Sequence, residues 1–196
     1  MTRHTLGVSL AIMLFWSALP VAAQEAASKT TKRRVQAVVH AAAGELKKVD
    51  SAMKTIAIKT AKGGEEAFKF TERTTVTGLE KGAKATSLAG KEGAEVVIHY
   101  TGEGAEKTAV AIEHIGREVV SVVEGSIVRV DSASRAVVVK TKEGAEETFH
   151  IGERATIDTA KGIRRSITSA GKEGAGVTVH YTTSAGRKIV HLLRHL

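Results

Sequence analysis

The stretch GKEGAEVVIHYT, residues 90–101, recurs almost unchanged as GKEGAGVTVHYT at residues 171–182. The flanking sequence follows the same displacement. A shift of about 81 positions superposes residues 44–115 on residues 125–196 without a gap, with about 26 identities in about 72 aligned positions. A continuous match of this length indicates an internal duplication. The sequence therefore predicts two copies of one folding unit.

Each copy alternates apolar and polar residues in short runs that are separated by glycine turns. The alternation is clearest at residues 56–58, 96–100 and 177–181. A period of two places every second side chain on the same side of an extended strand. Gly63-Gly64 and Ala185-Gly186 lie between such runs and predict hairpin loops. The pattern is therefore typical of half-buried antiparallel strands.

Five or six short strands per copy, with a less β-like segment before the last hairpin, predict an all-β fold. We expect two tandem small antiparallel β-barrels of the OB or SH3-like kind, with a pair of small β-sandwiches as the alternative. The repeats are expected at residues 36–116 and 117–196, as two separate domains, because each is large enough for its own core. The segments 85–90 and 166–171 are expected to form a helical turn or a loop.

The N-terminus has the order of a secretory signal. Arg3 supplies a basic start, residues 6–16 are apolar, and small residues lead up to Ala23. This order predicts a signal peptide at residues 1–23, cleaved after Ala23, followed by a basic flexible linker at residues 24–35. The chain contains no cysteine, so it offers neither a disulfide nor a lipid anchor on cysteine. We expect a periplasmic or secreted protein with no transmembrane segment in its mature form.

The order of the repeated motifs resembles an uncharacterised family of exported bacterial domains. The motifs are Val-Asp at residues 49–50, Lys-Thr at 59–60, Lys-Glu-Gly-Ala at 91–94 and Val-x-Ile-x-Tyr at 96–100. The resemblance implies small β-barrels that often follow signal peptides and often occur in tandem. Members of that family have no established activity, so the resemblance implies a fold and no chemistry.

The repeats also resemble, more weakly, the periplasmic copper-chaperone barrels of metal efflux systems. Those barrels hold Cu(I) through His, Met and Trp side chains on their second and third strands. The comparable stretch here, residues 55–70, contains none of these three residue types. Soft-metal binding at that place is therefore not expected.

The histidines are the candidate metal ligands. His99 recurs as His180, and the alternation places His99 on the outward side of its strand, paired with a residue near Thr108. His191 and His195 could chelate a metal together only if the C-terminal segment were helical. None of the four has a recognisable metal-ligand spacing, which favours surface or partly packed histidines, and no cofactor is expected.

Basic residues gather in two places, with 29 Lys and Arg against 21 acids in the whole chain. The candidate polyanion-binding residues are Lys32, Arg33 and Arg34 in the linker and Lys161, Arg164 and Arg165 in the second repeat. Such clusters attract anionic surfaces, although solvated surface charges have the same composition. The few aromatic residues are mostly predicted to face inward, which argues against nucleic acid as the partner.

No catalytic or phosphate-loop motif occurs in the sequence. The repeated pairs at residues 72–73 and 153–154, both Glu-Arg, are expected to be exposed turn charges. We therefore expect a non-enzymatic exported protein that acts as a binding or structural module in the cell envelope. Its partner is expected to be another envelope protein or an anionic surface, and a periplasmic metal carrier and a polyanion binder are the alternatives.

Overall fold

A computed structural model describes residues 37–196 of the chain. The predicted signal peptide 1–23, its cleavage after Ala23 and the linker 24–35, with Lys32, Arg33 and Arg34, lie outside the described residues. In the part that the structure describes, no helix is long and apolar enough to cross a membrane. Residues 36–196 form one compact unit.

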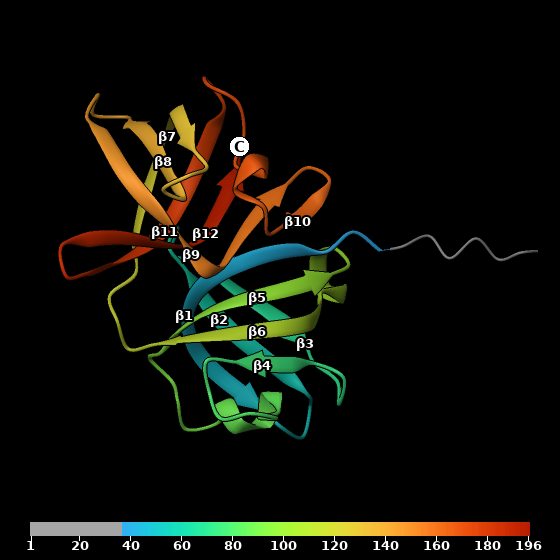
Figure 1. Cartoon of the computed structure of the whole chain (residues 1–196). Helices are drawn as coiled ribbons and strands as arrows, with labels where there is room; N and C mark the ends of the chain where they lie inside the picture. The colour runs from blue at the N-terminus through green and yellow to red at the C-terminus, as the bar shows by residue number, and fades with distance from the viewer. Residues whose placement is uncertain (1–36) are drawn as a thin grey trace, which may run out of the picture. The chain divides into compact units, whose positions relative to one another are not determined.

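The first sheet takes its six strands from the first repeat (Figure 1). They are β1 (His40–Asp50), β2 (Thr55–Thr60), β3 (Glu65–Lys69), β4 (Thr75–Thr77), β5 (Glu95–Thr101) and β6 (Thr108–Gly116). The order is β3-β2-β1-β5-β6-β4, and an additional pairing of β3 with β6 closes a ring. Both β3 and β4 run parallel to β6, one after the other along it. The ring is therefore a barrel of β1, β2, β3, β6 and β5.

The second sheet repeats this arrangement. Its strands are β7 (Ser121–Asp131), β8 (Ala136–Thr141), β9 (Glu146–Thr159), β10 (Gly162–Arg164), β11 (Gly176–Ser184) and β12 (Arg187–His195). The order is β10-β9-β12-β11-β7-β8, and pairing of β9 with β8 closes the ring. The single long strand β9 takes the place of both β3 and β4, and it pairs in parallel with β12.

The connectivity of both rings is that of the OB fold. The first strand of each ring lies between the second and the fourth, and the third strand runs parallel to the fifth. The predicted all-β fold with two OB-type barrels is therefore confirmed. The alternative of two β-sandwiches is wrong, because each sheet closes on itself.

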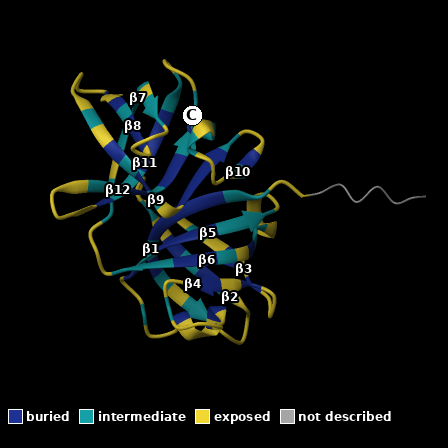
Figure 2. Cartoon of the chain, viewed as in Figure 1, coloured by how far each residue is buried: buried dark blue, intermediate teal, exposed yellow. Residues whose placement is uncertain are grey.

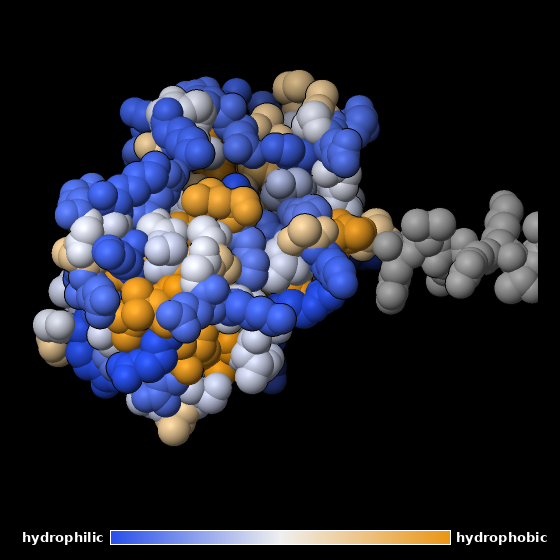
Figure 3. Space-filling view, turned by 90° about the horizontal axis from the view of Figure 1, so that it is seen from above, coloured by the Kyte–Doolittle hydropathy of each residue, from blue (hydrophilic) through white to orange (hydrophobic). Residues whose placement is uncertain are grey.

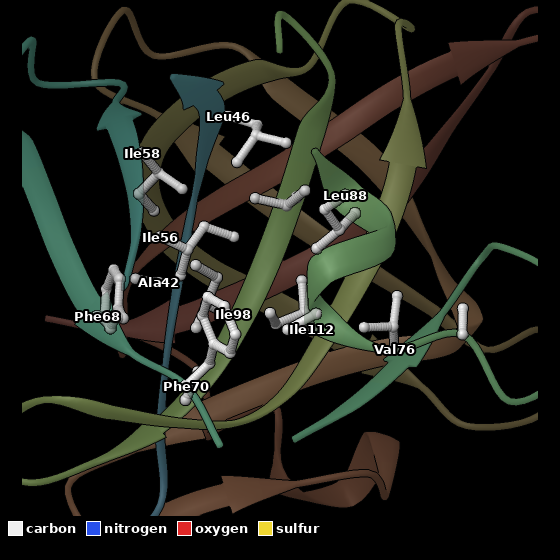
Figure 4. Packing of buried hydrophobic residues seen from close by; sticks show 14 residues of the cluster. Ala42, Leu46, Ile56, Ile58, Phe68, Phe70, Val76, Leu88, Ile98 and Ile112 are labelled. Carbon is white, nitrogen blue, oxygen red and sulfur yellow. The ribbon is translucent and has the colours of Figure 1, made fainter. Parts of the chain in front are cut away.

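The inward side of each barrel is filled by the alternating apolar residues. Ile56, Phe68 and Ile98 are buried in the first barrel. The segment before its last hairpin forms the 3-10 turn η1 (Ala85–Leu88), from which Leu88 projects into the same core (Figure 4). In the second barrel η3 (Ile167–Ser169) has the same place in the chain. The expected helical turns are confirmed, and each caps one barrel.

A glycine that both repeats share is explained by close backbone packing. A Cβ atom at Gly44 would collide with the carbonyl oxygen of Lys59, and one at Gly125 would collide with that of Lys140. Both glycines lie on the first strand of their barrel, opposite the end of the second. Only glycine allows the two strands to approach this closely.

The strands carry most of the buried residues, and the connecting turns carry most of the exposed ones (Figure 2). Hydrophilic side chains cover most of the face shown in Figure 3, with a few separate apolar patches between them. The most exposed large apolar residues, Met53 and Val119, are far apart in the sequence. Scattered apolar residues of this kind are normal on a protein surface.

Candidate functional site: the interface and cleft between the barrels

The two barrels contact each other through a small apolar cluster. Ala41, Ala43 and Val97 of the first barrel pack with Leu192 of the second, and all four are buried. The residues from the first barrel point away from its own core, because their sequence neighbours fill that core. The repeats, expected as separate domains, therefore lie packed together within one compact unit.

Asp158 is the polar centre of this interface. Its carboxylate is buried, and Oδ1 lies 3.0 Å from Nδ1 of His40 while Oδ2 accepts the backbone N–H of Ala41 at 3.2 Å. Nε of Arg194 lies 3.4 Å from Oδ2, and the same guanidinium donates to the carbonyl oxygen of Ala41. A buried carboxylate is stable only with such partners, and here they come from both barrels.

His99 lies in the same interface. It points away from the core of its own barrel, as expected, and its Nε2 is 2.7 Å from Oγ1 of Thr156 in the second barrel. Burial lowers the pKa of His99, and the nearby charge of Arg165 lowers it further. Its strand partner is Ala111, so the expected pairing near Thr108 is wrong. A bulge after His99 and the 3-10 turn η2, residues 104–106, shift the register.

A second charged pair joins the barrels at Glu113. This carboxylate is buried, and its Oε1 lies 3.5 Å from Nε of Arg154. Burial raises the pKa of Glu113, while Arg154 and Arg165 lower it. The Glu-Arg pair at 153–154 was expected in a turn, which is wrong, because β9 continues through it. The equivalent pair at 72–73 does lie exposed in the turn between β3 and β4.

A cleft of about 400 Å³ opens beside this interface. Its lining comes from both barrels and comprises Ala42, Ala43, Thr60, Ala61, Lys62, Glu66, Val122, Glu124, Thr178, His180, Arg194 and Leu196. Alanine methyl groups supply part of an apolar wall, and hydroxyl and charged groups supply the rest. The cleft is thus concave and mixed in polarity, as small-molecule sites are.

His180 is the least usual group in the cleft. Burial lowers its pKa to about 4, and the positive charge of Arg194 contributes in the same direction. The imidazole is therefore neutral at pH 7, with one ring nitrogen able to donate and the other able to accept. The side chain is partly buried, so the ring lies at the wall of the cleft.

The charges around the cleft neutralise one another. Nζ of Lys62 lies 3.7 Å from Glu124, which also binds Lys142, and Glu66 lies 2.6 Å from Nζ of Lys107. The hydrogen bond from Lys142 is the main reason that the pKa of Glu124 is lowered. A ligand in the cleft therefore meets paired charges and the neutral ring of His180.

The remaining histidine candidates have other partners. His191 Nε2 lies 3.0 Å from Oγ1 of Thr182, and His195 Nε2 lies 2.8 Å from the carbonyl oxygen of Ala170. Both are on β12, so the helical arrangement that would let them chelate a metal does not form. Across residues 37–196, no group of three or more His, Cys, Asp or Glu side chains could hold a metal ion.

The predicted basic cluster of the second repeat lies at the β9–β10 hairpin, with Lys161 in its turn, Arg164 at the end of β10 and Arg165 just after it. Lys161, Arg164 and Arg165 are all exposed. Arg164 donates to the carbonyl oxygen of the preceding residue, at 2.8 Å. The three basic residues thus lie close together in the chain, and the charge of Arg165 also acts on His99 and Glu113 of the first barrel.

Each barrel also has an aromatic pair covered by a lysine. The ring centroids of Phe68 and Tyr100 lie 5.1 Å apart, and those of Phe149 and Tyr181 lie 5.0 Å apart. Lys107 and Lys188 lie over these pairs at centroid distances of 5.2 to 5.6 Å. The phenylalanines face inward as expected, and the lysines occupy the approach to the rings. This arrangement leaves no open platform for a stacked base there.

No protein-family model matches the sequence, and no curated protein matches it either. Solved structures do match. The crystal structure of Ag(I)CusF is 19% identical and covers 39% of this chain and 96% of that chain, with a TM-score of 0.29. A Cu(II) structure of a tryptophan-to-alanine CusF variant from Escherichia coli has the same identity and TM-score, covering 39% and 91%.

A third similar structure is drosophila Unr CSD456, a cold-shock-domain protein. It is 14% identical, with a TM-score of 0.29, and covers 80% of this chain and 61% of that chain. The structural likeness is therefore to the CusF barrel and to cold-shock domains, and it assigns no family. The metals in the CusF structures belong to those proteins.

The cleft could not be found from the sequence, because its lining combines residues of both repeats that are far apart in the chain. One signal points to it. Residues 41–43 are three consecutive alanines within a strand, and all three are buried. A strand with one solvated side would alternate, so small residues on both sides indicate burial on both sides. The equivalent stretch of the second repeat, residues 122–124, is Val-Val-Glu.

Proposed function

We propose that this protein is a non-enzymatic binding module of the periplasm or cell envelope, and that its ligand binds in the cleft between the two barrels. The observation that carries the proposal is His180, a neutral imidazole at a cleft whose charged groups are otherwise paired. The His180 side chain is only partly buried and lines the cleft, so its imidazole can form a hydrogen bond with a ligand there. A ligand with a donor or acceptor group would supply the partner atom.

The chemistry of the cleft favours a small uncharged molecule with an apolar part and a hydrogen-bonding group. Ala43 and Ala61 offer methyl groups, and Thr178 adds a hydroxyl near His180. A charged ligand would have to compete with the ion pairs of Lys62 and Glu66. A volume of about 400 Å³ suits a small ligand rather than a folded partner.

The envelope location is supported by the order of charge, apolar run and small residues in 1–23. Metal carriage is a weaker alternative, since His99 already has Thr156 as a partner. Polyanion binding at Lys161, Arg164 and Arg165 is the other alternative, supported by their shared exposed hairpin.

The test is a screen of small uncharged polar molecules against the full chain, read out by the rise in thermal unfolding temperature. A ligand of the folded state raises that temperature by mass action. Ala61→Trp places a large ring at the exposed rim of the cleft. Ala145→Trp is the matched control, because Ala145 is exposed in the equivalent hairpin of the second barrel and lines no part of the cleft.

The proposal predicts a hit whose effect is lost in Ala61→Trp and kept in Ala145→Trp. Binding that survives Ala61→Trp, or a screen with no hit, would contradict it.

A further inference from the structure

The second barrel has a separate groove of about 380 Å³ on its outer surface. It is lined by Ser134, Arg135, His150, Ile151, Gly152, Glu153, Arg187 and Ile189. These residues come from the turn between β7 and β8, from β9 and from the start of β12. None of them lines the cleft between the barrels. The groove is therefore a second concave site, formed by one barrel alone.

Two guanidinium groups and an imidazole converge in this groove. Arg187 donates to Nδ1 of His150 at 3.1 Å, and Arg135 donates to the carbonyl oxygen of Gly152 at 3.2 Å. An arginine has no acceptor, so Nδ1 of His150 must accept, and the neutral ring carries its proton on Nε2. That N–H is a third donor.

The two arginines keep their charge uncompensated. Among the ion pairs formed within residues 37–196, none includes Arg135 or Arg187. Both side chains belong to exposed residues, and several N–H groups of each guanidinium remain available. Glu153 is the single acid of the groove, so the arginines outnumber it.

In the first barrel, the residues equivalent to those of the groove form ion pairs with one another. There Lys54 pairs with Glu72 at 3.1 Å, and Lys69 pairs with Glu106 at 3.0 Å. The residues that align with these four in the second repeat are Arg135, Glu153, His150 and Arg187. The acid Glu106 is thus replaced by a base, and a lysine is replaced by histidine.

The backbone at this place is the same in both barrels. Lys54 has φ 52° and Arg135 has φ 50°, both in the left-handed region that side chains other than glycine seldom adopt. The two turns therefore present their basic residue in the same way. The barrels differ in side-chain charge at this position. The first barrel has two ion pairs, and the second has more hydrogen-bond donors than acids.

We propose that this groove of the second barrel binds a phosphoryl group, free or carried on a larger molecule. Arginine presents N–H groups in a planar fork that matches phosphate oxygens, and charge-assisted hydrogen bonds of this kind are the stronger ones. The Nε2–H of His150 adds a neutral donor. Ser134 also lines the groove.

The test titrates the full chain with inorganic phosphate at constant ionic strength, following backbone amide NMR shifts around residues 134–135, 150–153 and 187. Arg187→Glu restores the charge that the first barrel has at Glu106, and we expect affinity to fall by about tenfold or more. Arg164→Glu is the matched control, because it makes the same charge change on the exposed β9–β10 hairpin. It is expected to change affinity by less than about twofold.

Vesicles of phosphatidylcholine with and without phosphatidic acid distinguish the source of the phosphoryl group. Saturable binding of phosphate, or of phosphatidic acid vesicles alone, supports the proposal if Arg187→Glu abolishes it and Arg164→Glu does not. Equal loss in both variants would mean attraction to general charge and would overturn it. Absence of binding to both probes would also overturn it. Neither variant touches the cleft of the proposed function, so the two proposals can fail separately.

Discussion

Replacing His180 with glutamine should change how stability depends on pH. Burial, with Arg194 nearby, lowers the pKa of His180 from 6.5 to about 4. The unfolded chain then takes up the proton at higher pH than the folded chain does. Stability from this group is therefore complete above pH 6.5 and is lost as pH falls from 6.5 toward 4. A shift of about 2.5 units corresponds to roughly 3 kcal/mol in the free energy of unfolding.

The measurement is urea unfolding of the full chain and of His180→Gln, followed by far-ultraviolet circular dichroism at pH 7 and pH 4. Glutamine does not titrate, so the free energy of unfolding of the parent relative to the variant should fall by about 3 kcal/mol over this range. Other titrating groups act equally on both chains and cancel in the comparison. A difference that stays constant within about 0.5 kcal/mol would refute the reasoning.

Three further changes test the packing. Leu192→Ala removes a buried side chain from the interface, and urea unfolding should show a loss of about 2 to 5 kcal/mol. Thr156→Val leaves Nε2 of His99 without its partner and should cost about 1 to 3 kcal/mol in the same assay, whereas an unchanged midpoint would contradict the contact. Gly44→Ala forces a collision with the backbone of Lys59 and should lower the unfolding temperature by several degrees, at roughly 2 kcal/mol or more. Gly64→Ala, whose added Cβ would meet nothing closer than 3.8 Å, should leave it nearly unchanged.

The barrel fold could be predicted because the information for it is local and is repeated. Alternation at residues 56–58 and 96–100 fixes which side of each strand is buried, and turn residues fix where the chain reverses. Asp50 illustrates the turn, since its Oδ1 accepts the backbone N–H of Met53 at 2.9 Å. Because the sequence is duplicated, each of these alternation and turn patterns occurs twice, and a chance pattern would not be expected to recur at the same spacing.

The meeting of the barrels could not be predicted, because its residues differ between the copies. Leu192 aligns with Ala111, and Asp158 aligns with Thr77. The outward position of His99 follows from the alternation, but a period of two cannot say whether water or another barrel lies outside. The partner of His99 depends on side chains from the other copy.

The two candidate sites could likewise not be predicted from local sequence patterns. The groove of the second barrel depends on which exposed charges lack an opposite charge, and this depends on pairings across strands such as that of Lys69 with Glu106. Comparing the two copies charge by charge is the one sequence signal for it, since Glu106 becomes Arg187. The cleft between the barrels leaves only the three buried alanines at 41–43 as a signal.

The claim on which the proposed function rests is that the two barrels form one body, because the cleft takes its lining from both. Backbone ¹⁵N relaxation of the full chain measures this directly. Packed barrels give one rotational correlation time for residues 40–116 and 121–195, set by the mass of both together. Two shorter times, one for each barrel, would contradict the interface at Leu192 and Asp158, and with it the cleft.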